Sequence, residues 1–268
     1  MKNISYLVIA AIILGAALTS CNDNDDNDDE VVFLLDETQN GTERTVYEYD
    51  KQNRIAKISK YNDGQLNWVE SLSYNINGDL VEMKTENVQN PSINYKTTFY
   101  KNSNKITYDE VFSRHSEIEL NIQGLPVKYT IVYDNGGGDG RTATIINTWQ
   151  NGNILKSESD EDAREFGEEG RIVGLGTFTH DNMKSPFYHC KTPEWFLWMR
   201  FRYIYGKNNI KTETWEFIPP IFYVLVPTYE YDYNDDGLPV IKYSIYPDGY
   251  IHTETYTYKK KLNASSQY

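Results

Sequence analysis

The sequence has few of the residues on which most enzymatic and metal sites depend. Its 268 residues include only two cysteines and four histidines, and it contains no nucleophile elbow, phosphate-binding loop or dinucleotide fingerprint. The 26 Lys and Arg residues are outnumbered by 39 Asp and Glu residues, which argues against binding a nucleic-acid backbone. A mean hydropathy of -0.64 argues against a multi-span membrane protein. The sequence therefore predicts a protein without enzymatic activity, without a cofactor and without a nucleic-acid partner.

The only long apolar run lies near the N-terminus. Residues 6–17 are too few to span a bilayer comfortably but suit the core of a signal peptide. Leu18, Thr19, Ser20 and Cys21 follow, and this order resembles the lipobox of bacterial lipoproteins. We therefore predict a signal peptide over residues 1–20, lipidation of Cys21 and attachment to a membrane through that lipid alone. An ordinary signal peptide with a chance cysteine is the alternative.

An acidic segment follows the predicted lipidation site. Residues 22–30 contain six Asp and Glu residues and nothing that could be buried, so we expect a disordered tether, which we extend over residues 21–40. Such a segment resembles the signal that places Bacteroides-type lipoproteins on the outer face of the outer membrane. A plain spacer and a periplasm-facing protein are the alternatives. If Cys21 is lipidated, Cys190 has no partner for an intramolecular disulfide.

The rest of the chain repeats one pattern: an aromatic residue, a polar turn rich in Asn, Asp and Gly, and then Ile or Leu. Because Asn, Asp and Gly tolerate the positive φ of tight hairpin turns, each copy predicts a turn between two strands. The clearest copies are 49–55, 74–80, 100–106, 205–210 and 233–238.

The strands between these turns alternate apolar and polar residues. Ile93, Tyr95, Thr97 and Phe99 fall on one face, for example, and their neighbours are mostly polar. A long meander of such strands twists and must curl with its apolar face inside. We therefore predict an all-β domain over residues 41–268, rolled into an open or closed barrel. A membrane-spanning barrel is the less favoured alternative, because Lys and Glu are frequent within the strands.

The repeats resemble the YD repeats of Rhs-type shell proteins. Together with the lipobox and the acidic segment, they more closely resemble a family of uncharacterised Bacteroides-type lipoproteins with a porin-like fold. That resemblance implies a barrel, and it implies no functional residues because the family has no established activity.

One segment, residues 178–202, departs from the repeat. Thr192 as N-cap, Pro193 at the first helical position and an acidic residue after it predict a short helix over 193–200. We expect this helix to plug the barrel or to form the lid of a ligand pocket. The candidate ligand-contact residues are Trp195, Trp198, Tyr188 and Phe187. The two prolines at 219–220 predict a loop or a bulged edge.

Two sets of residues are weak candidates for metal binding. His180, His189 and Cys190 have side chains suited to zinc, but their spacing is poor. Residues 232–237 fit the opening of a calcium loop, but the acid expected at its twelfth position is replaced by Tyr243. We therefore favour an aromatic loop and a hairpin turn at these two places.

The sequence as a whole predicts a non-enzymatic lipoprotein that presents a Tyr-rich β-scaffold to a glycan or protein ligand. A purely structural envelope protein is the first alternative, and an enzyme acting on polysaccharide is the second.

Overall fold

The computed structural model describes residues 31–110, 114–133, 141–162, 171–201, 205–218 and 226–262. The predicted signal peptide, Cys21, residues 22–30 and the two prolines at 219–220 lie outside these ranges. The described chain forms sixteen strands, a 3-10 turn at Pro91–Ile93 and one helix, α1, at Glu194–Phe201. The strands are β1 (Val31–Asn40), β2 (Glu43–Tyr49), β3 (Ile55–Asn62), β4 (Gln65–Tyr74), β5 (Leu80–Asn87), β6 (Tyr95–Asn102), β7 (Lys105–Glu110), β8 (Arg114–Leu120), β9 (Pro126–Tyr133), β10 (Arg141–Gln150), β11 (Asn153–Asp162), β12 (Arg171–Lys184), β13 (Asn208–Ile218), β14 (Thr228–Tyr233), β15 (Pro239–Ile245) and β16 (Ile251–Leu262).

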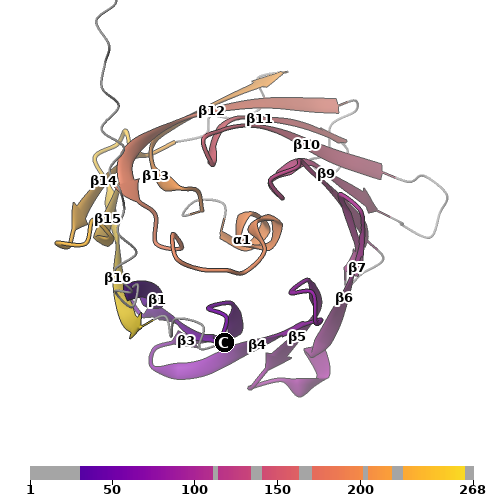
Figure 1. The fold of residues 1–268 in the computed structure, drawn as a ribbon. Coiled ribbons are helices and arrows are strands. Elements are labelled where there is room, and N and C mark those ends of the chain that lie inside the picture. Colours follow the sequence, from indigo (N-terminus) through magenta and orange to yellow (C-terminus); the bar gives the residue numbers. More distant parts are fainter. Residues whose placement is uncertain are drawn as a thin grey trace, which may run out of the picture.

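The strands form one closed barrel (Figure 1). Each strand pairs antiparallel with its neighbours in the chain, and β1 closes the barrel against β16, from Val31 opposite Leu262 to Gln39 opposite Thr255. The predicted all-β barrel is confirmed, and it is closed. Its predicted start at Gly41 is ten residues too late, because β1 uses the apolar residues from Val31 onward to complete the wall.

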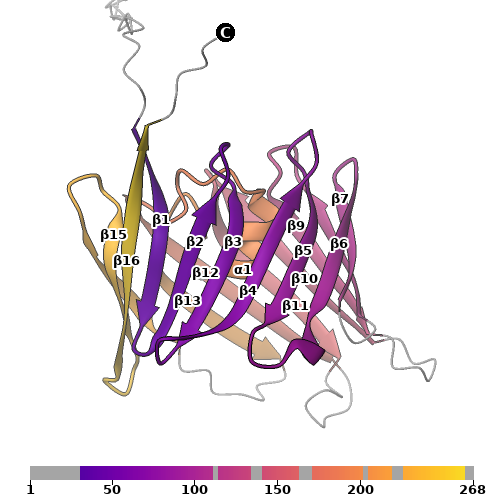
Figure 2. The ribbon, with the colours of Figure 1, turned by 90° about the horizontal axis from the view of Figure 1, so that it is seen from below.

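Four of the repeated turns share one hydrogen-bond pattern. The Oδ1 atom of an Asp or Asn accepts from the backbone N–H groups two and four residues later. The residue three positions later has a positive φ and is Asn53 or a glycine, which tolerate that conformation. Because successive strands alternate in direction, these turns lie at the barrel end where β1 begins and β16 ends (Figure 2). The turns begin at Asp50, Asn75, Asn121 and Asn234.

Tyrosine hydroxyls link successive strands near this end. Tyr74 on β4 donates to the carbonyl of Ile55 on β3 over 2.8 Å, and Tyr258 on β16 donates to the carbonyl of Pro239 on β15 over 2.7 Å. Tyr49 and Tyr231 bind the preceding strand in the same way. A buried carbonyl needs such a donor and Phe has none, which gives a physical reason for 23 Tyr against 10 Phe.

The outward face of the barrel carries ion pairs between neighbouring strands. Lys57 Nζ lies 2.8 Å from Glu48 Oε1, and Lys128 Nζ lies 3.3 Å from Glu119 Oε1. Ile146 is an exposed apolar side chain that lies between polar neighbours on this face, whereas the exposed Val173 on β12 lies opposite the exposed Ile218 on β13. A barrel wall that contacts lipid would instead carry an apolar outer band. Similar pairs join Lys96 to Glu82, Lys105 to Glu117, Arg171 to Asp160 and Lys259 to Asp36.

The helix α1 lies inside the barrel (Figure 1). It begins and ends one residue later than predicted, and Phe196 and Leu197 donate backbone hydrogen bonds to the carbonyl of Pro193. The Thr192 hydroxyl accepts from the backbone N–H of Ile55 over 2.7 Å, which fixes the helix to the wall. Among the residues that the structure describes, no helix is long and apolar enough to cross a membrane.

Candidate functional site in the barrel lumen

A cavity of about 710 Å³ lies in the lumen beside the C-terminal end of α1. Its lining includes Thr38, Thr45 and Tyr246, which lie near the turns at the barrel end opposite to the chain ends. The cavity therefore occupies the half of the lumen away from the described chain ends. Its charged residues are Lys60, Arg200, Lys242, Glu213 and Glu254, and its aromatic residues are Tyr47, Phe201, Trp215, Tyr229 and Tyr246.

One wall of the cavity holds a buried ion triad. Glu70 on β4 is 3% exposed, and its Oε1 atom contacts both Lys60 Nζ on β3, at 3.0 Å, and the guanidinium of Arg200 in the last turn of α1. Burial alone would raise the pKa of Glu70, but the charges of Arg200 and Lys60 outweigh it and lower this pKa. The triad thus ties the end of the helix to the barrel wall and presents two cations to the cavity.

A second charged group lies on β15 and β16. Lys242 stands directly opposite Glu254 in the strand register, yet Lys242 forms no ion pair with any carboxylate of the described residues. Its Nζ atom instead lies 4.6 Å from the centroid of the Tyr229 ring. Glu254 Oε2 accepts a 2.7 Å hydrogen bond from Tyr256. Burial lowers the pKa of Lys242, against the opposite effect of the nearby carboxylates of Glu254 and Glu213.

A flat aromatic surface lies on the inner wall beside these charges. The Trp215 and Phe217 rings on β13 are nearly parallel, with an interplanar angle of 13° and centroids 6.0 Å apart. A Cβ atom at Gly176 on β12 would lie 2.9 Å from the indole of Trp215, and one at Gly174 would lie 2.9 Å from Phe217. The two glycines therefore let both rings lie against the wall. Trp215 lines the cavity and is only partly buried, so part of its indole is accessible from the lumen.

The chain matches no protein-family model and no curated protein. Solved structures resemble it, among them two porin-like proteins. A porin-like protein from Bacteroides uniformis is 14% identical, with a TM-score of 0.38 over 85% of this chain and 95% of that one. A porin-like protein from Bacteroides vulgatus is 9% identical, with a TM-score of 0.43 over 84% of this chain and 99% of that one. The resemblance to YD repeats and to uncharacterised lipoproteins stays a prediction.

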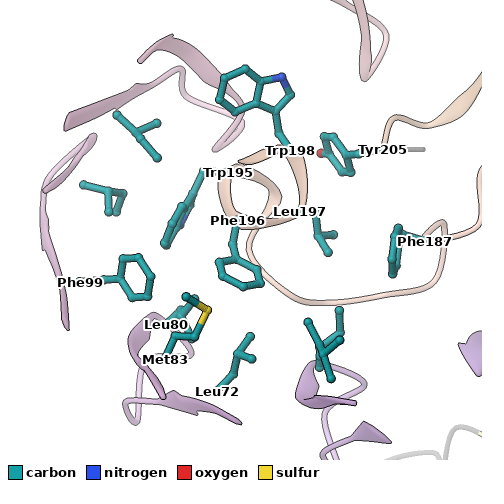
Figure 3. Close-up of a cluster of buried hydrophobic side chains, with 14 of the residues drawn as sticks. Leu72, Leu80, Met83, Phe99, Phe187, Trp195, Phe196, Leu197, Trp198 and Tyr205 are labelled. Atoms are coloured by element: carbon teal, nitrogen blue, oxygen red, sulfur yellow. The ribbon is translucent and has the colours of Figure 1, made fainter. Parts of the chain in front are cut away.

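Of the aromatic residues predicted as ligand contacts, Trp195 and Trp198 belong to α1, and Phe187 lies on the segment before it (Figure 3). Trp195 packs edge-on against Phe99, with ring centroids 5.1 Å apart, and Trp198 packs in the same way against Tyr129 at 6.0 Å. Both Trp side chains are buried in the contact between helix and wall, as expected of a plug. Phe187 and Tyr188 line a second cavity, of about 670 Å³, between the plug segment and the turns at the chain-end side.

The metal candidates do not come together. Within the described ranges, no group of three or more His, Cys, Asp or Glu residues could hold a metal ion. His180 is partly buried on β12, and burial lowers its pKa. His189 Nδ1 lies 3.2 Å from the backbone oxygen of Phe33. Cys190 has its pKa raised to about 11 by burial, so its thiol stays protonated at neutral pH.

The charged residues of the first cavity were not predicted from the sequence, although a weak signal existed. Glu254 has the same strand parity as Tyr256 and Tyr258, and Glu213 has the same parity as Trp215 and Phe217. A charged residue in phase with the aromatic, inward-facing positions of a strand points into the lumen. The approach of Arg200 on α1 to Lys60 and Glu70 on the neighbouring strands β3 and β4 had no such signal.

Proposed function

We propose that the protein is a lipid-anchored surface protein that binds a saccharide in the lumen of its barrel. The observation that carries this proposal is the cavity, in which the accessible indole of Trp215 lies beside the fixed carboxylates of Glu213 and Glu254. Aromatic faces contact the C–H faces of sugar rings, and carboxylates accept hydrogen bonds from sugar hydroxyls. Such a combination of one apolar surface with a few oriented polar groups is typical of small-ligand sites.

The carboxylates are held in place by aromatic donors, which supports a binding role. Tyr229 donates to Glu213 Oε1 over 2.5 Å, and Trp215 Nε1 donates to Glu213 Oε2 over 3.3 Å. Oriented groups lose little conformational entropy when a ligand binds. Turnover of the ligand is not part of the proposal.

The proposed location combines the predicted lipid at Cys21 with the polar outward face of the barrel. A wall with ion pairs such as Lys57–Glu48 suits water rather than hydrocarbon. A tether joined to β1 would hold the barrel by its chain-end side. The cavity would then face away from the membrane, toward the outside of the cell.

A purely structural envelope protein is the second candidate. The observation that favours it is the filled half of the lumen, where Trp195, Phe196 and Trp198 are all less than 5% exposed. The cavity at the other end of α1 is the reason that we rank binding first.

A calorimetric screen of mono- and oligosaccharides against the full mature chain tests the binding proposal. We expect at least one saccharide to bind, and Trp215→Ala to weaken it about ten-fold or more, because a central aromatic contact is lost. Tyr100→Ala is the matched control, since Tyr100 is 63% exposed outside the cavity. Absence of binding, or equal affinity in both variants, would contradict the proposal and favour the structural role.

Cell fractionation of Cys21→Ser tests the anchor separately. The thiol is the acceptor for the lipid, so we expect the variant to leave the membrane fraction while the parent protein stays in it. Continued attachment of Cys21→Ser to membranes would refute the lipid anchor and leave saccharide binding untouched.

A further inference from the structure

The same pairing of Lys and Glu across neighbouring strands has different outcomes on the two faces of the barrel. On the outward face, Glu48 opposite Lys57 and Glu119 opposite Lys128 form ion pairs at 2.8 Å and 3.3 Å. In the lumen, Lys242 opposite Glu254 forms none. The strand register therefore places Lys242 and Glu254 opposite each other, as in the outward pairs, but no ion pair forms between them.

Lys242 is a buried cation for which the described residues supply no oxygen partner. It is only 6% exposed, and its Nζ atom lies over the face of the Tyr229 ring. Both oxygens of Glu213 accept from Tyr229 and Trp215, and Glu254 accepts from Tyr256. The side chain is largely removed from solvent and lines the cavity, so an oxygen supplied by a ligand in the cavity would stabilise its charge.

We propose that the saccharide bound in the cavity carries a carboxylate, as a uronic acid does, and that Lys242 binds this carboxylate. The inference rests on the proposed function and names the class of sugar that the site takes. Glu254 would accept a hydroxyl of the same sugar, and the ring would lie against Trp215. Each of the three residues lines the same cavity.

A carboxylate suits this position better than a phosphate. Burial lowers the pKa of Lys242, and the nearby carboxylates of Glu213 and Glu254 only partly oppose this effect. The same two carboxylates would repel a second negative charge on the ligand. The cations of Lys60 and Arg200 already share the carboxylate of Glu70. Lys242 is therefore the cavity cation that most needs a singly charged partner.

The test compares two ligands that differ only at one carbon. Methyl galacturonoside and methyl galactoside are titrated calorimetrically into the full mature chain at pH 7. We expect the acid to bind about ten-fold more tightly, the size expected for one hydrogen bond to a charged group. Lys242→Gln should reduce this ratio to about one, and Lys242→Arg should keep part of it. Lys57→Gln, on the outward face, should leave the ratio unchanged.

A second measurement does not depend on affinity. In the protein methylated reductively with ¹³C at its lysines, the acidic glycoside should raise the pKa of Lys242, because an anionic partner favours the charged amine. The resonance is assigned by its loss in Lys242→Gln. Equal affinity for the two glycosides, or a ratio that Lys242→Gln leaves unchanged, would overturn this inference while saccharide binding stands. Failure of every saccharide to bind would overturn the proposed function as well.

Discussion

The outward face and the lumen of the barrel use the same charged residues in different ways. On the outward face, Lys57 and Glu48 are 40% and 55% exposed and form a close ion pair. In the lumen, Glu70 is held by two cations, whereas Lys242 forms no ion pair among the described residues. The wall between these two environments is one strand thick, so the same strands present charged side chains to both of them.

Exposed ion pairs, the buried ion pair of Glu70 and the buried Lys242 have different roles in this protein. Water and salt screen an exposed pair, so forming or losing it changes stability little. A buried charge is costly to desolvate and is expected to have a partner. Glu70 meets that expectation, and its role is to hold α1 against the wall. Lys242 does not, which is why we assign it to a ligand.

Removal of Arg200 is expected to have the larger effect on stability. Arg200→Met leaves Glu70 buried with Lys60 as its remaining cation, so we expect the free energy of unfolding to fall by about 2–3 kcal/mol. Urea denaturation measures this change. Lys128→Met on the outward face is the matched control and should change stability by less than about 1 kcal/mol. Equal effects of the two substitutions would show that the lumen does not strengthen ion pairing.

The same variant should alter the response of stability to acid. The pKa of Glu70 is lowered in the folded protein, so its contribution is present above the ordinary carboxyl pKa, about 4.3, and is lost as the pH falls through the lower folded value. In Arg200→Met the folded pKa rises toward or above the ordinary value, so this part of the acid sensitivity should shrink. The free energy of unfolding of both proteins is measured by urea denaturation between pH 2 and about 6. If it fell with pH equally in the parent protein and in Arg200→Met, the role given to Arg200 would be contradicted.

The fold was predictable from local chemistry to a large extent. The Asn, Asp and Gly turns at Asn75 and Asn234 and the alternation of the strands between them predicted a curled meander, and Thr192 with Pro193 predicted α1. Closure of the barrel was not predictable in the same way, because β1 and β16 are separated by most of the chain. The sequence did not predict that the barrel begins at Val31, because the acidic residues directly before Val31 favour disorder.

The site was much less predictable than the fold. Its charged residues come from β3, β13, β15, β16 and α1, and no local pattern joins elements so far apart in the sequence. The aromatic residues that stood out in the sequence, such as Trp195 and Trp198, form the packed plug instead. Trp215 was overlooked because it lies in a regular strand, where its accessible indole depends on the glycines of β12.

The smallest expected effect concerns the outward pair of Glu48 and Lys57. In a double-mutant cycle with Glu48→Ala and Lys57→Ala, we expect a coupling energy of about 0.2–1 kcal/mol, because both side chains are well exposed. Raising the salt concentration from 0.05 M to 1 M should remove most of it. The corresponding cycle for Glu254 and Lys242, with ligand absent, should show weaker salt dependence, because that pair lies within the lumen where screening is poor. A salt-insensitive coupling for Glu48 and Lys57 would mean that the outward face is not bathed in water, and the proposed placement of the barrel outside the bilayer would then fail.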